Sequence, residues 1–290
     1  MPLSPEIAGF YNTAAFMTYA RELDAALNDV PTDIPGMVAY IQNLLLHVHW
    51  APAYHVRLDQ QGQDETHLRS IHEMIAAMQA RDPRPLAFVR TPAQRAVGNC
   101  RHFSTFGTAL FRRAGIPARA RCGFGMYFEA GKGVDHWVIE YWNGTGWQFL
   151  DAQIDPLQRS VLKLDFDPLN VPRDRFLTGG DAWSQCRAGR KDAQAFGIMD
   201  MRGWWFIAGN VIRDMAALNN MEMLPWDVWG AMLQPNDPVT PQVNALYDRL
   251  SALTADPDAH FTEMRELYYE PQIYMPSQVF NALRQQMEKI

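Results

Sequence analysis

The sequence predicts an α+β protein in which two helical regions flank a short β-rich centre. Apolar residues recur every three or four positions in the N-terminal and C-terminal parts of the chain, which is the spacing of amphipathic helices. Between these parts, Asp135–Trp142 is rich in aromatic and β-branched residues, and the Asn143-Gly144 that follows is a strong hairpin signal. We therefore expect a helical region over 1–85, a core over 86–156 and a mostly helical region over 157–290 that packs on the core.

The N-terminal region is expected to contain three helices, over about 6–29, 37–50 and 64–80. Pro52 stops the second helix. The proline-rich stretch over 82–85 then reads as a linker to the core.

The core begins with a short helix from Thr91 to Ala96, with proline at its first position. Gly98 then allows a tight approach into a helix that starts near Cys100 and stops at Gly115. Gly107 inside this helix costs about 1 kcal/mol relative to alanine. A close neighbour, such as a packed sheet, would explain why glycine stands there.

Strands follow this helix. Residues 118–124 alternate in polarity, which predicts a half-buried strand with Arg119 and Arg121 on its solvated face. Gly123–Gly133 is glycine-rich and is expected to form a mobile loop over a site. The hairpin then returns over Thr145–Asp151.

The hairpin has two possible registers. If its loop is Asn143-Gly144, His136 lies directly opposite Asp151, with Cβ atoms about 4.5–5.5 Å apart. If its loop is Asn143–Gly146, His136 lies opposite Gln153, and Asp151 becomes a diagonal neighbour. Both registers place His136 and Asp151 on the same face of the sheet.

The C-terminal region is expected to be helical, after an irregular linker that follows residue 156. Apolar spacing and proline positions predict helices over about 181–187, 203–218, 225–235, 240–254, 258–269 and 276–288.

Composition excludes several classes of function. The chain is 48% hydrophobic and 20% charged with a formal net charge of -6, so we expect no nucleic-acid partner. No apolar run approaches the roughly 20 residues of a membrane-spanning helix, and no secretory signal opens the chain. We expect a cytoplasmic protein with no membrane partner. The sequence does not determine its oligomeric state.

Metal and cofactor sites are not expected either. The three cysteines (Cys100, Cys122 and Cys186) lack the spacing of zinc ligands or of a disulfide framework. His47 and His49 are close in sequence, but residues two apart on a helix point to different faces.

One constellation suggests catalysis: Cys100 at a helix start, His136 on a strand and Asp151 on the returning strand. A helix N-terminus favours the thiolate, which is the attacking form of cysteine. His136 and Asp151 would then be the base and the residue that orients it. A lone cysteine on an apolar helix is more often a small core residue, so its position on the secondary structure carries the functional interpretation.

Four segments together resemble the transglutaminase-like superfamily, and the resemblance covers roughly residues 88–156. They are Gly98-Asn99-Cys100-Arg101, Gly115-Ile116-Pro117-Ala118-Arg119, Asp135-His136-Trp137 and Phe149-Leu150-Asp151. The resemblance implies a papain-like core in which a helix opened by the nucleophile packs on a small antiparallel sheet. It also implies that Cys100 attacks an acyl carbon to give a thioester, that His136 takes and returns the proton, and that Asp151 holds the histidine.

Other roles in the site follow less directly. The backbone N–H of Cys100 is the natural first oxyanion donor. Gln94 is a candidate second donor, and an exposed glutamine is the alternative. Arg101, Asp135 and Trp137 are candidates for substrate binding, with structural bracing, loop capping and packing as their respective alternatives.

The resemblance implies an acyltransferase or a hydrolase of the peptidase or amidase type, acting without metal or organic cofactor. Its substrate would be a small molecule or peptide that carries an amide or acyl group. Water or an amine would resolve the thioester, and hydrolysis is the default because excluding water takes a specific closed site. The alternative function is a non-catalytic binding or scaffold protein built on the same core.

Overall fold

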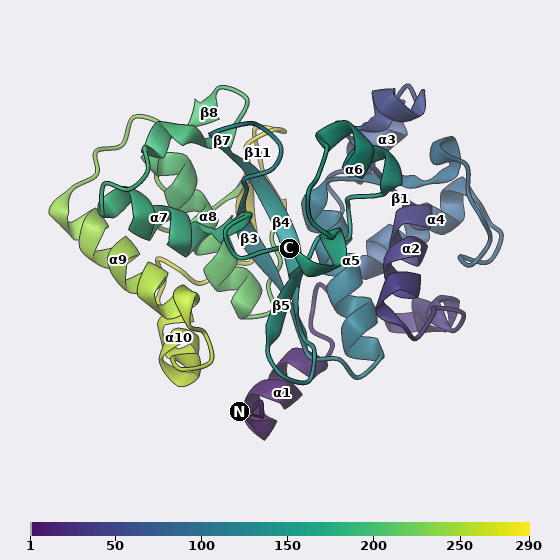
Figure 1. Cartoon of the computed structure of the whole chain (residues 1–290), viewed down its shortest axis with the longest axis horizontal. Coiled ribbons are helices and arrows are strands. Elements are labelled where there is room, and N and C mark those ends of the chain that lie inside the picture. The colour runs from purple at the N-terminus through teal and green to yellow at the C-terminus, as the bar shows by residue number, and fades with distance from the viewer. Residues whose placement is uncertain (1) are drawn as a thin grey trace. The chain divides into compact units, whose positions relative to one another are not determined.

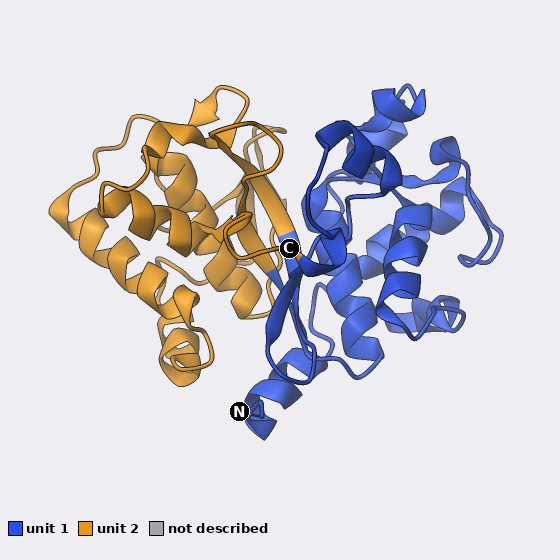
Figure 2. Ribbon diagram, in the orientation of Figure 1, with its two compact units in different colours: residues 1–120, 138–170 blue, residues 121–137, 171–290 orange. Residues whose placement is uncertain are grey.

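The structure is a computed structural model that describes residues 2–290, and it confirms the predicted α+β class. The chain forms two compact units, coloured separately in Figure 2. Unit 1 comprises residues 1–120 and 138–170, and unit 2 comprises residues 121–137 and 171–290. Two strands, β3 (Ala118–Gly125) and β4 (Gly133–Trp142), contribute residues to both units (Figure 1). The predicted division into 1–85, 86–156 and 157–290 follows sequence character and stays a prediction.

Unit 1 contains all the helices that the structure describes between residues 2 and 120. Helices α2 and α5 lie side by side (Figure 1), and their facing side chains, with those of α4, β4 and β5, form a continuous buried core. The elements are α1 (Pro5–Asn12), η1 (Arg21–Leu27), α2 (Ile34–Leu44), β1 (Leu45–His47), η2 (Ala51–Tyr54), α3 (Gln60–Glu65), α4 (Ile71–Arg81), η3 (Pro92–Gln94), β2 (Ala96–Gly98), α5 (Cys100–Arg113), β5 (Trp147–Leu150), α6 (Pro156–Leu162) and η4 (Pro168–Asn170).

The three predicted N-terminal helices are each shorter than expected. The helix expected over 6–29 is two separate pieces, α1 and η1. The helix expected over 37–50 ends at Leu44, because Leu45–His47 pairs in parallel with Ala96–Gly98 as β1 and β2. The helix expected over 64–80 is divided into α3 and α4.

Ser70 and Glu73 start α4. The Ser70 hydroxyl accepts a hydrogen bond from the Glu73 backbone N–H, and the Glu73 carboxylate accepts one from the Ser70 backbone N–H. This reciprocal cap fixes the helix start at Ile71, several residues later than apolar spacing alone indicates.

Helix α5 begins at Cys100, as the sequence predicts. It ends before Gly115, whose positive φ of 78° is incompatible with a continued helix. The predicted close neighbour of Gly107 is present. A Cβ atom at Gly107 would collide with the end of the Ile139 side chain on β4 and would press on Ile41 of α2 at 3.1 Å. The glycine therefore lets the helix approach both elements.

The hairpin has the longer of the two predicted loops. Trp142 pairs with Trp147 and Ile139 with Leu150, so Asn143–Gly146 form the loop and the register that places His136 directly opposite Asp151 is wrong. The Asn143 side-chain oxygen accepts hydrogen bonds from the backbone N–H groups of Thr145 and Gly146, at 2.9 and 3.0 Å. These bonds favour the four-residue turn over the two-residue turn that Asn-Gly usually forms.

Strand β3 is buried along its whole length, so the prediction of a half-buried strand with a solvated arginine face is wrong. In unit 1, the Arg119 guanidinium donates to the Glu140 carboxylate at 2.7 Å and lies 3.9 Å from the Trp147 ring centre. In unit 2, Arg121 makes a two-pronged contact with Asp214, at 2.9 and 3.0 Å. Both arginines are buried because carboxylates on other elements compensate their charges.

Unit 2 contains short strands that pair with β3 and β4, together with the helices α7, α8, α9 and α10. The strand order is β6-β3-β4-β7-β8 with β5 paired to β4, and α7, α8 and α9 pack against one another (Figure 1). The elements are β6 (Phe176–Thr178), α7 (Gly179–Arg187), η5 (Ala193–Ala195), β7 (Phe196–Ile198), β8 (Met201–Arg202), α8 (Trp204–Leu218), β9 (Asp227–Val228), α9 (Pro241–Ala255), α10 (Phe261–Tyr268), β10 (Gln278–Asn281) and β11 (Gln286–Lys289).

Two C-terminal predictions are wrong. The stretch 225–235 contains β9 instead of a helix, and 276–288 contains the antiparallel hairpin of β10 and β11. Strands β9 and β10 pair with each other, at Val228 with Phe280 and at Asp227 with Asn281. The tertiary pairing overrides the helical spacing of both segments.

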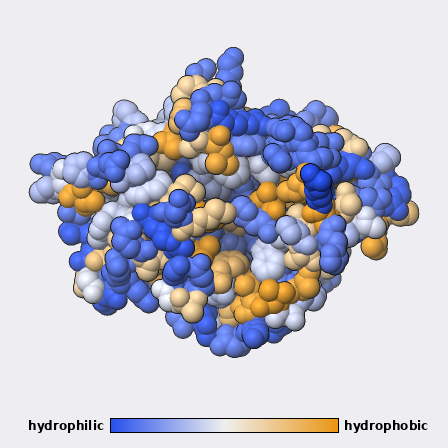
Figure 3. Space-filling view, turned by 90° about the horizontal axis from the view of Figure 1, so that it is seen from above, coloured by the Kyte–Doolittle hydropathy of each residue, from blue (hydrophilic) through white to orange (hydrophobic). Residues whose placement is uncertain are grey.

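Surface polarity is mixed. On the face shown in Figure 3 hydrophilic residues predominate, and hydrophobic ones form separate patches among them. Such scattered exposure is usual for folded proteins. Within residues 2–290, every helix is too short or too polar to cross a membrane.

Candidate functional site

Cys100 is the first residue of α5 and lies in unit 1, with 6% of its surface exposed. Asn99 caps the helix: its side-chain oxygen accepts a hydrogen bond from the Arg101 backbone N–H at 3.0 Å. Gly98 contributes space, because a Cβ atom there would lie 2.7 Å from the Cβ of His102. The Gly-Asn-Cys sequence therefore provides a close approach, a cap and a side chain at the helix N-terminus.

His102 completes the cap and is a poor candidate for the base. Its Nδ1 accepts a hydrogen bond from the Asn99 backbone N–H at 3.2 Å. Burial, together with the nearby charge of Arg101, lowers the pKa of His102 well below the ordinary value for histidine. His102 is thus a neutral histidine with a structural role.

Asp151 also lies in unit 1, directly after β5, and is buried. Its backbone N–H donates to the Pro168 carbonyl at 2.8 Å, and its carboxylate accepts from the Gln153 backbone N–H at 3.0 Å. Both ends of the residue are therefore held, which restricts the orientation of its carboxylate.

His136 lies on the part of β4 that belongs to unit 2 and is buried among aromatic rings. The ring centres of Phe128, Tyr127 and Phe176 lie 4.8, 5.9 and 6.5 Å from that of the imidazole. Phe128 and Tyr127 come from the glycine-rich segment that the sequence predicts as a loop over a site. The sequence does not predict these aromatic neighbours of His136, because contacts between side chains of a loop and a strand leave no pattern in it.

The three candidate catalytic residues are thus divided between the units. Cys100 and Asp151 belong to unit 1 and His136 to unit 2, and β4 passes from unit 2 to unit 1 between Trp137 and Val138. The β4–β5 pairing ends at Ile139 and Leu150, so it includes neither His136 nor Asp151.

Asp135, next to His136, takes part in a buried polar network in unit 2. Its carboxylate accepts a hydrogen bond from the Asn210 amide at 2.8 Å, and the Asn210 oxygen accepts one from Arg213 at 3.2 Å. Burial raises the pKa of Asp135, although the Asn210 hydrogen bond and the charges of Arg213 and His136 oppose the rise. Asp135 therefore fastens β4 to α8, and a role in substrate binding stays a prediction.

The other predicted site residues have structural contacts of their own. Arg101 is fully buried and donates to the Leu68 carbonyl at 3.3 Å, while the Gln94 side-chain oxygen accepts hydrogen bonds from the Thr91 backbone N–H and hydroxyl at 3.0 and 2.9 Å. Trp137 is buried in unit 2. The roles of Arg101, Gln94 and Trp137 in binding or oxyanion stabilisation remain predictions.

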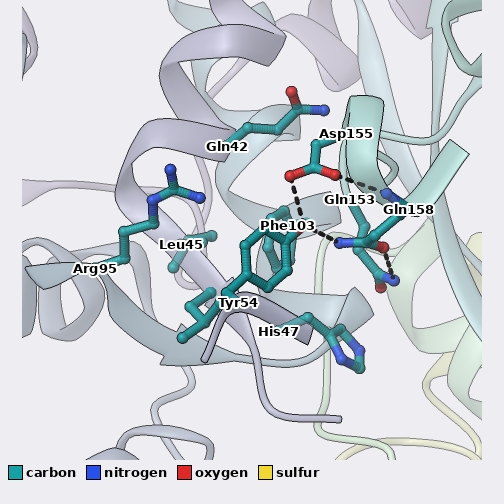
Figure 4. Close-up of a pocket in the computed structure, with 10 residues that line it drawn as sticks. Gln42, Leu45, His47, Tyr54, Arg95, Phe103, Gln153, Asp155 and Gln158 are labelled. Atoms are coloured by element: carbon teal, nitrogen blue, oxygen red, sulfur yellow. Dashed lines mark hydrogen bonds between the residues drawn. The ribbon is translucent and has the colours of Figure 1, made fainter. Parts of the chain in front are cut away.

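A pocket within unit 1, which the sequence did not indicate, lies beside α5 (Figure 4). It measures about 200 Å³ including the open space at its mouth. Its lining comes from segments that are distant in sequence, so no motif could reveal it. The lining residues are Gln42, Leu45, Leu46, His47, Tyr54, Arg95, Phe103, Gln153, Asp155 and Gln158.

In the part of the chain that the structure describes, no three or more His, Cys, Asp or Glu residues form a group able to hold a metal ion. His47 lies on β1 and His49 in the following turn, with ring centres 5.6 Å apart, so the helix expected to separate them is absent.

Comparisons with known proteins bear on the same region. Residues 60–152 match the family model of the transglutaminase-like superfamily core, and this segment includes Cys100, His136 and Asp151. No curated protein matches the chain. One solved structure, of a suspected cysteine protease from Cytophaga hutchinsonii, is 16% identical with a TM-score of 0.37, over 61% of this chain and 46% of that one. The chain thus spans less than half of that protein's length. The similarity to the core of the transglutaminase-like superfamily is thus confined to residues 60–152 of this chain.

Proposed function

We propose that the protein is a cysteine-dependent enzyme that cleaves or transfers an acyl group held as an amide or thioester. Cys100 is its nucleophile, His136 its general base and Asp151 the residue that orients the histidine. The observation that carries the proposal is the position of Cys100 as the first residue of α5, inside the segment that matches the superfamily. His136 and Asp151 fall within the same matched segment.

The proposed reaction has two steps. The Cys100 thiolate attacks the acyl carbon, a C–S bond forms, and the C–N or C–S bond to the leaving group breaks as the imidazolium of His136 gives the leaving group a proton. Water or an amine then attacks the thioester while His136 accepts its proton, and the bond to Cys100 sulfur breaks. The products are the acid or the new amide together with the original thiolate.

The surroundings of Cys100 support this role. Negative charge at the first position of a helix is stabilised by about 0.3–1 kcal/mol at exposed sites, and somewhat more in partly buried ones. Asn99 and His102 hold the helix start in place, so the sulfur occupies a defined position. Pre-positioned groups of this kind contribute much of enzyme catalysis.

Alkylation by iodoacetamide tests the nucleophile, with the other two cysteines as internal controls. Cys122 is fully buried, and burial raises the pKa of Cys186 to about 11. We expect iodoacetamide near pH 7 to modify Cys100 at least tenfold faster than Cys122 or Cys186, as mapped by peptide mass spectrometry. A Cys100→Ser variant should lose this fast labelling.

Equal labelling of the three cysteines, or none at Cys100, would contradict the proposal and favour a non-catalytic scaffold. His136→Asn and Asp151→Asn variants extend the test to the rest of the site. Both should slow the alkylation of Cys100 and change its dependence on pH, while circular dichroism reports whether the fold is retained.

The choice between hydrolysis and transfer needs a separate measurement. A panel of short peptide amides and peptide thioesters is incubated with the protein in the presence and absence of glycinamide, and the products are identified by mass spectrometry. Free acid in both reactions identifies a hydrolase, and an added glycinamide group identifies a transferase. No product from any amide or thioester, despite fast labelling of Cys100, would restrict the proposal to binding.

A further inference from the structure

The pocket beside α5 presents unused hydrogen-bonding groups (Figure 4). Arg95 lines one side, and the Nε of its guanidinium is buried without a hydrogen-bond partner among the described residues. Gln153 lines another side; it is 2% exposed, and its side-chain oxygen also lacks a partner within residues 2–290. A buried donor or acceptor without a partner destabilises the fold, so these two atoms favour the binding of a polar group in the pocket.

The other polar residues of the pocket are already satisfied. The Tyr54 hydroxyl donates to the Asp155 carboxylate, which also accepts the Gln158 backbone N–H at 3.0 Å. The Gln153 amide donates to the Gln158 side-chain oxygen at 3.0 Å. Gln42 donates to two carbonyl groups, those of Ala152 and Ile154. This network fixes the pocket and leaves Arg95 and the Gln153 oxygen to meet a ligand.

The charge of Arg95 determines which class of ligand the pocket favours. Burial lowers the pKa of Arg95, with only partial compensation by Tyr54 and Asp155, so its cation lies in a partly desolvated place. A carboxylate would compensate this charge and accept from the guanidinium. The Gln153 oxygen needs a donor, which the N–H of an amide beside the carboxylate would supply.

The pocket lies close to the nucleophile along the chain. Phe103, on its wall, follows Cys100 by three residues on α5, and residues with that spacing lie on the same side of a helix. His47 pairs with Gly98, two residues before Cys100. The Gln153 backbone N–H donates to the Asp151 carboxylate at 3.0 Å. All of these residues belong to unit 1.

We propose that this pocket binds a carboxylate and a neighbouring amide N–H of a peptide-like substrate, with Arg95 as the anion-binding residue and Gln153 as the acceptor. The pocket is small, so it would receive one end group of a substrate and not a whole substrate. The inference deepens the proposed function and rests on it only for identifying the ligand as substrate. A carboxylate can come from a peptide C-terminus or from an acidic side chain.

Binding is measured with a Cys100→Ala variant, which cannot turn over substrate, by isothermal titration calorimetry at constant ionic strength. The probes are acetyl-alanyl-alanine with a free carboxylate, acetyl-alanyl-glutamic acid α-amide, and neutral acetyl-alanyl-alanine amide. We expect at least one charged probe to bind about tenfold or more tightly than the neutral one. The tighter charged probe identifies the source of the carboxylate.

Arg95→Gln in the same background should abolish this preference, and Arg95→Lys should retain part of it. Arg57→Gln is the matched control, because Arg57 is exposed and outside the pocket, so the preference should persist. Equal binding of charged and neutral probes, or equal losses for both on changing Arg95, would overturn the inference. If Arg95→Gln fails to fold, the folded Arg95→Lys variant decides by the same comparison.

The two proposals fail separately. Fast alkylation of Cys100 without a preference for carboxylates removes only the pocket assignment. A preference that depends on Arg95, together with an unreactive Cys100, keeps the pocket as a carboxylate-binding site and removes the enzyme proposal.

Discussion

At the scale of single residues, buried arginines on β3 are each compensated by a carboxylate on another element. Arg119 shows this arrangement in unit 1, where the Glu140 carboxylate accepts a hydrogen bond from its guanidinium. The ring centres of Trp147 and Tyr11 lie 3.9 and 4.9 Å from the guanidinium carbon. Removing one partner of a buried pair leaves a charge without compensation, which is more costly than losing both. Alternating polarity cannot distinguish such arginines from solvated ones, because the carboxylate partner lies on another strand.

The Arg119–Glu140 pair leads to a stability prediction. Arg119→Met should lower the free energy of unfolding by about 3–5 kcal/mol, because Glu140 then remains buried and charged. The double variant Arg119→Met, Glu140→Leu should recover most of this loss. Urea denaturation followed by circular dichroism measures both. Arg113, which is exposed and pairs with Asp24, is the control, and its change to Met should have an effect below about 1 kcal/mol. A double variant as unstable as the single one would contradict the expectation.

Asp135 gives a prediction for pH dependence. Its pKa is raised in the folded protein from an unfolded value of 3.8, so ionisation above pH 4 disfavours the folded state. The stability it contributes is complete below pH 3.8 and is lost as pH rises through the folded pKa. Asp135→Asn keeps the acceptor for Asn210 and removes the titration, so it should gain stability relative to the wild type between pH 4 and pH 7. Parallel urea titrations at both pH values measure this, and a difference that does not change with pH would contradict it.

At the scale of elements, the start of α5 could be predicted and its capping partner could not. Gly98, Asn99 and the helix start at Cys100 follow from residue types that favour close approach and capping. The role of His102 as the reciprocal cap has no sequence signal, because histidine is an unusual residue in that position. The consequence is that the geometry around Cys100 depends on two side chains outside the proposed triad.

A change at Gly98 tests this dependence. Gly98→Ala would place its Cβ 2.7 Å from the Cβ of His102, so His102 must move and the cap of α5 weakens. We expect the alkylation rate of Cys100 to fall severalfold and the stability of the protein to fall by about 0.5–2 kcal/mol. Combining Gly98→Ala with His102→Gly removes the Cβ atom that the new methyl group would meet and should restore part of the alkylation rate. Unchanged labelling in the single variant would show that the cap does not position the sulfur.

The sequence predicts an element well where its local residues determine the structure. It predicts less well where contacts with residues distant in sequence determine it. The hairpin, α5, α8 and α9 appear near the predicted positions, because Asn-Gly, glycine stops and proline starts act locally. The register of the hairpin needed the side chain of Asn143, and β1 needed its pairing with β2. The pocket beside α5 was beyond reach for the same reason, since Arg95 and Gln153 meet only in the folded chain.

At the scale of the whole molecule, the chain ends in a hairpin that completes the second unit. Val279 and Asn281 of β10 are almost fully buried, and the Ala282 backbone N–H donates to the Trp226 carbonyl at 3.0 Å. Helical spacing over 276–288 concealed this hairpin, because its turn is formed by hydrogen bonds to the Asn281 side chain instead of by glycine or proline. The C-terminal residues are therefore part of the folded unit.

Truncation tests the contribution of this hairpin. Removing residues 277–290 exposes the edge of β9 and the contacts of Val279, and should lower the free energy of unfolding by at least about 2 kcal/mol. Limited proteolysis should then cut unit 2 faster than unit 1. The exposed Met287 on β11 provides the control, since Met287→Ser should change neither measurement. Equal proteolysis of the full and truncated chains would contradict the expectation.

The tight fit of Gly107 against Ile139 and Ile41 has a consequence for sequence variation. A larger residue at position 107 becomes acceptable only when the side chains facing it become shorter, for example when valine replaces isoleucine at 139. Related proteins should therefore show substitutions at these two positions together, and glycine should persist wherever the facing residue is long. Position 107 thus records, in the evolutionary history of the chain, how closely this helix must approach its sheet.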